Sequence, residues 1–382
     1  MKKFLFGKLK TAIVCLLVCL LALGGLTSCG TSQTDSWAGY SMDSYYFDTI
    51  CRITIYGLDD SLIGEGLTED EFGDACSMII KDAFKKLAAY ENMLSRTKEG
   101  SDVYRINHSS GEEVAVDPET IEVLKAALTC GDMSGGTFDI TIGGVSELWN
   151  FHALDEETAA AGLPDEEALS EALKHVGIEN IVVNFADNWV KLRDPDTVID
   201  LGGIAKGYIA DRITEFLKEQ GVTDAIVNLG GNIEALGGKP VNHLKPRGDS
   251  SESGTVRIGI NDPRDDSGKL LMTFDTRDVT VVTSGTYERY IEVDGVRYHH
   301  ILDPKTGYPV DNGLIQVTIV GARKHSVYCD GLSTICLALG LEDGKALIDD
   351  LSAKQIFGPV WAVFVTTDGE VVEAGEKPSF VD

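Results

Sequence analysis

The chain has 382 residues and is strongly acidic: 33 Lys and Arg stand against 61 Asp and Glu, a formal net charge of −28. This charge argues against nucleic acid or anionic lipid as a partner and favours a ligand held in a local site or through a bridging cation. The length is sufficient for one large domain or two fused lobes.

The first 40 residues have the pattern of an export signal and a tether. Four lysines precede an uncharged apolar stretch, and Leu26-Thr27-Ser28-Cys29 resembles a bacterial lipobox. We therefore expect cleavage after residues 1–28, lipidation of Cys29, and a tether of residues 29–40 that holds an extracytoplasmic domain, residues 41–382, at a membrane. A soluble secreted protein cut nearby is the alternative.

Eight cysteines are present, and Cys15 and Cys19 lie in the expected signal. The other five, apart from Cys29, are an odd number without CxxC spacing, which is not typical of a disulfide framework or a zinc site. Buried free thiols are expected, although a Cys329–Cys336 pair stays open. These five are Cys51, Cys76, Cys130, Cys329 and Cys336.

Apolar periodicity predicts the helices and strands of the domain. Helices are expected at residues 71–94, 117–130, 166–175, 208–219 and 326–339. Strands are expected at residues 50–56, 181–183, 189–192, 198–200, 224–228, 233–236, 256–260, 270–274, 279–283, 290–293, 296–300, 314–320 and 361–366. Because strands outnumber helices in an irregular order, we expect an α+β (mixed α/β) domain, with antiparallel or mixed sheets packed by helices. Residues 240–254 are polar and predict a surface excursion.

The first segment with chemical potential is residues 200–207, Asp-Leu-Gly-Gly-Ile-Ala-Lys-Gly, between a predicted strand and a predicted helix. Main-chain N–H groups at a helix start favour an anion such as phosphate. Asp200 and Lys206 flank the turn with opposite charges, suited to a metal-bound or hydroxyl-rich group and to a phosphate. A plain strand-to-helix connection explains the same residues.

The second segment, residues 299–307, has two histidines before an Asp-Pro-Lys-Thr-Gly turn. A histidine that ends a strand can remove a hydroxyl proton near neutral pH. His300 is favoured over His299, since alternation along the strand directs His299 to the other face. A structural histidine is the competing interpretation.

Two further segments carry polar groups beside small residues. Asp330 and Thr334 are four residues apart on one helical face, and their oxygens suit Mg²⁺. Helix capping by Asp330 is the alternative. In the glycine-rich residues 135–144, Phe138 is a stacking candidate and Asp139 a polar anchor. A glycine-rich loop over an aromatic core cluster that includes residues 148–151 explains them equally well.

In their order along the chain, these motifs resemble the ApbE family of FAD:protein FMN transferases. The resemblance covers residues 46–365 and includes four more segments: residues 46–49, residues 94–107 with Ser95, Ser101 and Asn107, residues 228–232, and residues 284–290. There are two departures. Phe-Asp-Thr at residues 47–49 replaces the usual Met-Gly-Thr, and Cys329 stands where alanine is usual before Asp330.

The resemblance implies a Mg²⁺-dependent enzyme that cleaves FAD, transfers FMN to a Thr or Ser hydroxyl of a target flavoprotein, and releases AMP. It implies that Asp330, Thr334 and the carbonyl of Gly203 bind Mg²⁺ and that His300 is the general base. The FAD-contacting positions that it implies are Phe47, Thr97, Thr137, Phe138, Asp139, Asp200, Lys206 and Ile301.

Two other functions fit the sequence less fully. A non-catalytic FAD-binding lipoprotein could use the same pocket, and a solute-binding lipoprotein of a transporter would share the signal and the acidity. The transporter function requires neither Mg²⁺ nor the combination of Asp330, Thr334 and His300. The sequence names no acceptor protein, oligomeric state or particular membrane.

Overall fold

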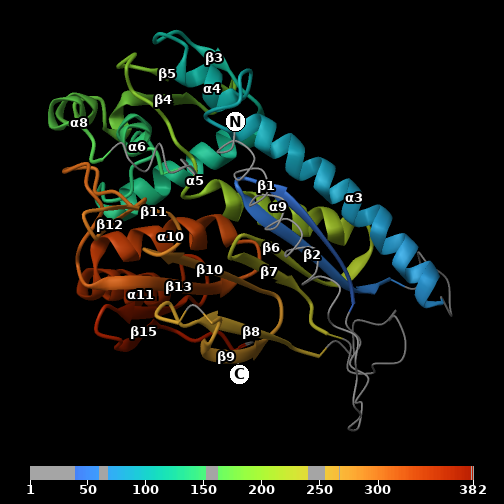
Figure 1. Cartoon of the computed structure of the whole chain (residues 1–382). Coiled ribbons are helices and arrows are strands. Elements are labelled where there is room, and N and C mark those ends of the chain that lie inside the picture. Colours follow the sequence, from blue (N-terminus) through green and yellow to red (C-terminus); the bar gives the residue numbers. More distant parts are fainter. Residues whose placement is uncertain are drawn as a thin grey trace, which may run out of the picture. The chain divides into compact units, whose positions relative to one another are not determined.

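The computed structural model describes residues 39–59, 68–151, 162–239, 254–265, 267–379 and 381. Figure 1 shows its elements. The expected signal, the lipidation site, nearly all of the tether and the excursion at residues 240–253 lie outside these ranges. Trp37–Asp382 form one compact unit. In the part of the chain that is described, no helix is both long enough and apolar enough to cross a bilayer.

An eight-stranded sheet in which all neighbouring strands are antiparallel forms the centre of the unit. Its strands, in order across the sheet, are β1 (Tyr40–Tyr46), β2 (Thr49–Leu58), β6 (Val222–Leu229), β7 (Asn232–Leu236), β10 (Val279–Gly285), β13 (Leu314–Ala322), β14 (Trp361–Thr366) and β15 (Val371–Gly375). In β2, Cys51 and Ile53 are fully buried, and Arg52 between them is exposed. This alternation gives the sheet a face for the core.

Helices cover that face and close the main core (Figure 1). They are α3 (Glu69–Leu94), α9 (Ala205–Glu219), α10 (Ser326–Leu339) and α11 (Leu341–Lys354), with α5 (Pro118–Ser134) packed on α10. On the other face, β8 (Val256–Asn261) and β9 (Leu270–Thr276) pair with each other and bury a second cluster against the sheet. The arrangement confirms the expected α+β class.

Smaller elements surround one end of this core. A three-stranded sheet is formed by β3 (Val114–Ala115), β5 (Trp189–Leu192) and β4 (Ile181–Asn184). The hairpin of β11 (Tyr290–Val293) and β12 (Val296–His299) confirms the turn expected at Asp294-Gly295. Short helices are α4 (Asp102–Asn107), α6 (Gly143–Trp149), α8 (Glu166–Leu173) and the 3-10 turn η1 (Ile178–Asn180).

The strand expected at residues 198–200 is wrong. Val198 makes a single bridge to Ile142. The N–H and C=O of Ile199 instead bond the side chain of Asn107, at 2.8 and 2.9 Å. The main-chain groups of Ile199 are thus unavailable to a strand ladder, and the segment is an extended loop.

Helix α10 begins at Ser326, as predicted, so Asp330 lies in its second turn. The N–H groups of Ser326 and Val327 donate to the carboxylate of Asp211, both at 3.1 Å. The interpretation of Asp330 as a cap of its own helix is therefore wrong, because Asp211 on α9 satisfies the first N–H groups of α10. Asp330 instead accepts from the N–H of Gly207 in the first turn of α9.

Other helix ends differ from the expected ones by a few residues. Helix α5 runs to Ser134, α8 ends at Leu173, and α9 begins at Ala205, three residues before the expected start. The five cysteines of the domain are free and buried, so Cys329 and Cys336 do not pair.

Helices α9 and α10 approach each other closely at Gly207. A Cβ at this position would lie 2.2 Å from the carbonyl oxygen of Ser326 and 2.7 Å from Cβ of Asp330. We predict that Gly207→Ala separates the helices and lowers the free energy of unfolding by about 1–3 kcal/mol, as overpacking does. Urea denaturation measures the loss. In the control Gly73→Ala, the new Cβ would meet only Tyr40, at 3.5 Å; a loss as large in this variant would contradict the steric explanation.

Glu234 on β7 is fully buried beside Asp211, and both burial and the charge of Asp211 raise its pKa well above 4.5. The folded state therefore holds a proton that the unfolded state releases above about pH 4.5, so stability falls as pH rises toward the folded-state pKa. We predict that Glu234→Gln removes this fall, which is about 1.4 kcal/mol per pH unit for one proton.

Urea titrations of both proteins at several pH values from 5 to 8 measure the two slopes. Glu342 is exposed in the first turn of α11, and Glu342→Gln should retain the slope of the unmodified protein. Parallel slopes for the unmodified protein and Glu234→Gln would show that Glu234 does not carry the proton.

Candidate active site

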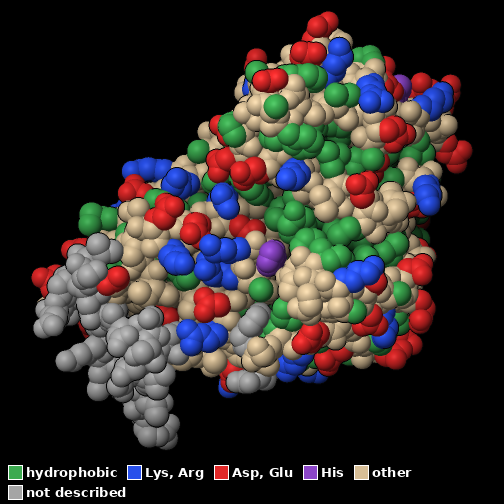
Figure 2. Space-filling view, turned by 180° about the vertical axis from the view of Figure 1, so that it is seen from behind, with side chains coloured by type: hydrophobic (Ala, Val, Ile, Leu, Met, Phe, Trp, Pro, Cys, Tyr) green, Lys and Arg blue, Asp and Glu red, His purple; other side chains and the backbone are tan. Residues whose placement is uncertain are grey.

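A cavity of about 1130 Å³ opens between the end of the β1–β2 hairpin, α6, the start of α9 and the start of β11. This volume is slightly above the usual range for small-molecule sites, so the cavity has room for a dinucleotide. In Figure 2, a histidine side chain is visible between basic and hydrophobic side chains on the face opposite to the view of Figure 1. The cavity is lined by all twelve predicted site residues: Phe47, Thr97, Thr137, Phe138, Asp139, Asp200, Gly203, Lys206, His300, Ile301, Asp330 and Thr334.

His300 follows β12 and is fixed by one main-chain carbonyl. Its own N–H donates to the carbonyl oxygen of Arg289 at 3.0 Å, and its ring Nδ1 lies 3.2 Å from the same oxygen. This network assigns the proton to Nδ1 and leaves the Nε2 lone pair as the basic site. Burial lowers the pKa of His300 to about 4; the Arg289 carbonyl opposes this, and the charge of Lys206 adds to it. The ring is thus neutral at physiological pH.

His299 has a different environment, as the alternation of the strand predicted. It is buried, its Nε2 lies 2.9 Å from the carbonyl oxygen of Val310, and its Nδ1 accepts from the N–H of Ile301 at 3.3 Å. Both ring nitrogens are occupied, so the structural interpretation applies to His299.

Asp330 and Thr334 present oxygens from one side of α10. Asp330 is buried, and one carboxylate oxygen accepts from the N–H of Gly207 at 2.8 Å. Burial raises the pKa of Asp330, while the nearby charge of Lys206 lowers it. The hydroxyl of Ser284 lies 3.4 Å from that of Thr334. A carboxylate with neighbouring hydroxyls is a donor set of hard oxygens, the type that Mg²⁺ prefers.

Gly203 lies directly beside these groups. A Cβ on Gly203 would be 3.1 Å from the ring of Phe138 and 3.8 Å from the hydroxyl oxygen of Thr334. The absent side chain lets the main chain of the turn approach Thr334 and the aromatic ring. The turn and α10 are thus close in space, although Gly203 and Thr334 are 131 residues apart in the sequence.

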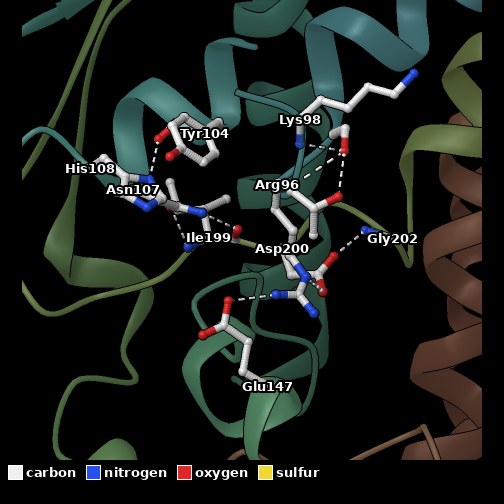
Figure 3. A network of polar contacts seen from close by, with 11 residues as sticks. Arg96, Lys98, Tyr104, Asn107, His108, Glu147, Ile199, Asp200 and Gly202 are labelled. Atoms are coloured by element: carbon white, nitrogen blue, oxygen red, sulfur yellow. Dashed lines mark hydrogen bonds and ion pairs between the residues drawn. The ribbon is translucent and has the colours of Figure 1, made fainter. Parts of the chain in front are cut away.

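Arg96 holds the Asp200 turn through an ion pair (Figure 3). Its Nε lies 3.0 Å from Oδ2 of Asp200, and its Nη1 lies 2.6 Å from Oε1 of Glu147 on α6. Asp200 also accepts from the N–H of Gly202 at 2.8 Å. Lys206, in the first turn of α9, donates to the carbonyl of Gly202 at 3.3 Å. Both charged residues of the sequence motif therefore stabilise the turn and also face the cavity.

The three polar residues of the segment 94–107 act on the main chain. Ser101 caps α4, accepting from the N–H of Tyr104 at 2.9 Å, and its hydroxyl donates to the carbonyl of Ser95. Asn107, at the end of α4, holds Ile199 (Figure 3). These hydrogen bonds position the loop that carries Arg96 and hold Ile199, the residue before Asp200.

Phe47 and Asp48 form the two-residue turn of the β1–β2 hairpin, with φ of 54° and 57°. The N–H of Phe47 donates to Oε1 of Glu91 at 2.7 Å. Thr97 lies at the exposed rim of the cavity, and Ile301 is buried in its wall. Both turn residues, Phe47 and Asp48, are in the left-handed region, where Asp is tolerated better than most residues.

The glycine-rich segment contributes both to the core and to the cavity wall. Phe138 is buried in the main core and also lines the cavity. Both carboxylate oxygens of Asp139 accept main-chain N–H groups, from Thr141 at 2.8 Å and Ile178 at 3.0 Å. Asp139 therefore orders this wall, whatever contact it makes with a ligand.

The aromatic residues that follow form a core cluster, as the alternative interpretation expected. Trp149 stacks on Phe151 with ring centroids 5.7 Å apart, and its Nε1 donates to the carbonyl of Gly307 at 2.7 Å. Phe151 lies edge-on to His300, with centroids 6.5 Å apart. The cluster supports the turn after His300.

The sequence interpretation missed Arg96, Glu147, Asn232, Glu288 and Arg289, which also line the cavity. Arg96 and Arg289 lie inside two of the segments that resemble the ApbE family. Their positive charge within those segments was the one sequence feature that could have indicated a role in the cavity. Glu147 is on a short helix that was not predicted, and nothing in its local pattern indicated a site.

One group of potential metal ligands lies away from the cavity. Ligand atoms of His175, Asp194 and Asp196 are within 4.8 Å of one another. Nδ1 of His175 and Oδ2 of Asp194 are 2.7 Å apart, and Oδ1 of Asp194 accepts from the N–H of Asp196 at 3.0 Å. These contacts link the loop after α8 to the turn after β5.

A profile of the ApbE family matches residues 47–357. The chain belongs to the ApbE family. An FAD:protein FMN transferase of Treponema pallidum (strain Nichols) is 33% identical over 361 residues, which are 93% of this chain and 91% of that protein. One of Klebsiella pneumoniae (strain 342) is 32% identical over 292 residues, 76% of this chain and 82% of that protein.

Two solved ApbE structures have the same fold. The ApbE protein of Thermotoga maritima superposes with a TM-score of 0.71 at 30% identity, covering 88% of this chain and 96% of that one. The flavin transferase ApbE of Vibrio cholerae superposes with a TM-score of 0.68 at 26% identity, with the same two coverages, 88% and 96%. The mixed α+β architecture is therefore that of the ApbE family.

The double hydrogen bond from Asn107 predicts a local effect on this ApbE site. Asn107→Ala leaves the N–H and C=O of Ile199 without their partner, so we expect a loss of about 1–3 kcal/mol in stability and faster amide hydrogen exchange at Ile199 and Gly202. The side chain of Asn184 forms hydrogen bonds within its own turn, with Ala186 and Asp187. Asn184→Ala is therefore the control. Unchanged exchange at both amides in Asn107→Ala would contradict the positioning role.

Proposed function

We propose that this chain transfers FMN from FAD to a Thr or Ser hydroxyl of an acceptor protein and releases AMP. The transferase activity rests on membership of the ApbE family and on relatives named FAD:protein FMN transferase that align over most of the chain. The observation that best supports the residue roles is that the twelve predicted positions line one cavity.

In the proposed reaction, Nε2 of His300 takes the proton of the acceptor hydroxyl. The hydroxyl oxygen bonds to the FMN-side phosphorus, the phosphoanhydride bond breaks, and its electron pair leaves with the oxygen of AMP. A neutral imidazole with Nδ1–H held by the Arg289 carbonyl is oriented for this role before substrate arrives. Positioning and charge neutralisation supply most of the rate in such phosphoryl transfers.

We further propose that Asp330, Thr334 and the carbonyl of Gly203 hold Mg²⁺. The oxygen donors of α10 fit this ion, and the missing side chain of Gly203 fits a main-chain ligand from the turn. Bound Mg²⁺ supplies positive charge to the pyrophosphate, which an acidic chain needs.

The remaining predicted residues are proposed to contact FAD. Lys206 lines the cavity together with Asp330 and His300 and would act there as a point charge on the phosphates. Phe138 offers an aromatic edge next to Gly203. The other proposed contacts are Phe47, Thr97, Thr137, Asp139, Asp200 and Ile301.

The location of the enzyme is also a proposal. The sequence of residues 1–29 supports export, removal of residues 1–28 and a lipid anchor on Cys29, with residues 41–382 as the extracytoplasmic catalytic domain.

The function is tested by mass spectrometry of an acceptor flavoprotein incubated with the domain, FAD and Mg²⁺. We expect the acceptor to gain one FMN phosphoester on Thr or Ser while AMP accumulates in equal amount. FAD binding without a mass gain on acceptors that other ApbE transferases modify would support storage instead, and AMP release without acceptor labelling would indicate hydrolysis.

His300 predicts an unusual pH dependence. The free enzyme needs a neutral imidazole, and burial lowers the pKa of His300 to about 4. We therefore expect protonation of His300 to lower kcat/KM for FAD only near pH 4. A change near pH 7 would belong to Glu288 in the same cavity, since burial raises its pKa to about 7. His300→Ala should lose transfer at least about 100-fold, the low end for general-base catalysis.

His299→Gln is the matched control, because His299 has a structural environment. This variant should have a lower midpoint temperature of unfolding, but its kcat/KM for FAD should decline at the same acidic pH as that of the unmodified enzyme. A decline of kcat/KM centred near pH 6.5 that persists in Glu288→Gln, or full transfer by His300→Ala, would refute the assignment of the base.

A further inference from the structure

The outer face of the β1–β2 hairpin carries an exposed apolar pair at the end next to the cavity. Tyr45 and Ile50 are cross-strand partners, and they are 63% and 64% exposed. The next pair on this face is Asp43 and Arg52, joined by a 2.6 Å ion pair. Aromatic and β-branched partners of this size usually pack against a neighbour.

Nothing on the neighbouring strand covers Ile50. Cys51 pairs with Leu229 of β6, so Ile50 lies beside the turn at Gly230 and Gly231. A Cβ on Gly231 would meet no atom within 4 Å. A Cβ on Gly230 would lie 2.3 Å from the hydroxyl oxygen of Thr49, so neither glycine provides a side chain that shields Ile50. We name Tyr45, Ile50, Gly230 and Gly231 the hairpin strip.

The hairpin strip leads into the cavity. Tyr45 and Gly230 belong to both the hairpin strip and the cavity lining. At the turn, Nη2 of Arg289 donates to the carbonyl of Phe47 at 3.5 Å, and the carbonyl of Arg289 holds the ring of His300. One residue therefore connects the hairpin to the proposed base, so a molecule bound on the hairpin strip would have a fixed position relative to His300.

We propose that the hairpin strip is the docking surface for the acceptor protein, which places apolar side chains there and inserts its Thr or Ser hydroxyl toward His300. The inference rests on the proposed function, because that reaction needs a second, macromolecular substrate that enters from outside the cavity.

Charge favours a protein over an anionic membrane as the occupant. Arg52, the basic residue of the adjacent pair, is paired with Asp43. Arg289 near the turn donates to the carbonyl of Phe47, and Asp48 is exposed at the turn. An anionic bilayer would need a cluster of basic residues at this surface. Continuity with the cavity favours the acceptor over a second copy of this chain.

Ile50→Glu tests the docking surface, since Ile50 does not line the cavity. The control is Val371→Glu, which changes an exposed β-branched residue on β15 at the opposite edge of the sheet. The acceptor probe is the protein that acquires covalent flavin in cells with the unmodified chain, identified by in-gel flavin fluorescence and purified from cells that lack the gene.

For Ile50→Glu, we expect kcat/KM for the acceptor to fall at least about tenfold through KM, the loss typical of an interface anchor. The Kd for FAD, followed by flavin fluorescence, should stay within about twofold. Val371→Glu should behave as the unmodified chain. If Ile50→Glu unfolds, Ile50→Thr keeps the β-branched shape and should show a smaller loss in the same direction.

Several results would overturn the inference. An acceptor KM unchanged in Ile50→Glu and Ile50→Thr excludes docking there, and equal losses in Ile50→Glu and Val371→Glu show a general effect of charge. Dimers of the unmodified chain that Ile50→Glu dissociates without loss of transfer identify a second copy as the occupant. If the unmodified chain labels no protein in cells or in vitro, the proposed function itself fails.

Discussion

The contact between α9 and α10 at Gly207 is the constraint on which the rest of the site depends. With no side chain at this position, the main chain of α9 lies against Ser326 and Asp330, and its N–H reaches the Asp330 carboxylate at 2.8 Å. The same approach aligns Asp211 with the first N–H groups of α10. The glycine turn before α9 is therefore held next to Thr334, and two segments distant in sequence become one site.

The cavity places fixed positive charge inside an acidic protein. Arg96 is oriented by Asp200 and Glu147, Lys206 by the carbonyl of Gly202, and Arg289 lies beside the hairpin turn. Because these cations are already oriented, a phosphate-bearing ligand meets them without a large reorganisation. Carboxylates such as those of Asp139, Glu147 and Asp330 line the same cavity, so the oriented cations are set among acids, in keeping with the acidic chain.

The periodic spacing of apolar residues and the turn motifs made much of this structure predictable from the sequence. The long helix α3, the hairpin at Asp294-Gly295 and α10 follow directly from apolar spacing and turn residues. The strand expected at residues 198–200 failed because Asn107, more than ninety positions earlier, takes both main-chain groups of Ile199. Local patterns contain no information about such a partner. Helix α6 was missed for a related reason, since its seven residues are too few for a period to be visible.

The site residues could be anticipated because their motifs occur in family order, and their convergence on one cavity supports that reasoning. Their supporting contacts could not. Nothing local indicates that Arg289 holds His300 through its carbonyl, or that Glu147 shares Arg96 with Asp200. These contacts depend on tertiary packing, which brings loops from separate elements to one end of the sheet.

The most direct test of the account is a crystal structure of the domain with FAD and Mn²⁺ in place of Mg²⁺, in which anomalous scattering locates the metal. The account predicts a peak coordinated by Asp330, Thr334 and the Gly203 carbonyl, with the FAD pyrophosphate beside it and His300 facing the FMN-side phosphorus. A peak at His175, Asp194 and Asp196 alone, or FAD bound outside the cavity, would contradict it.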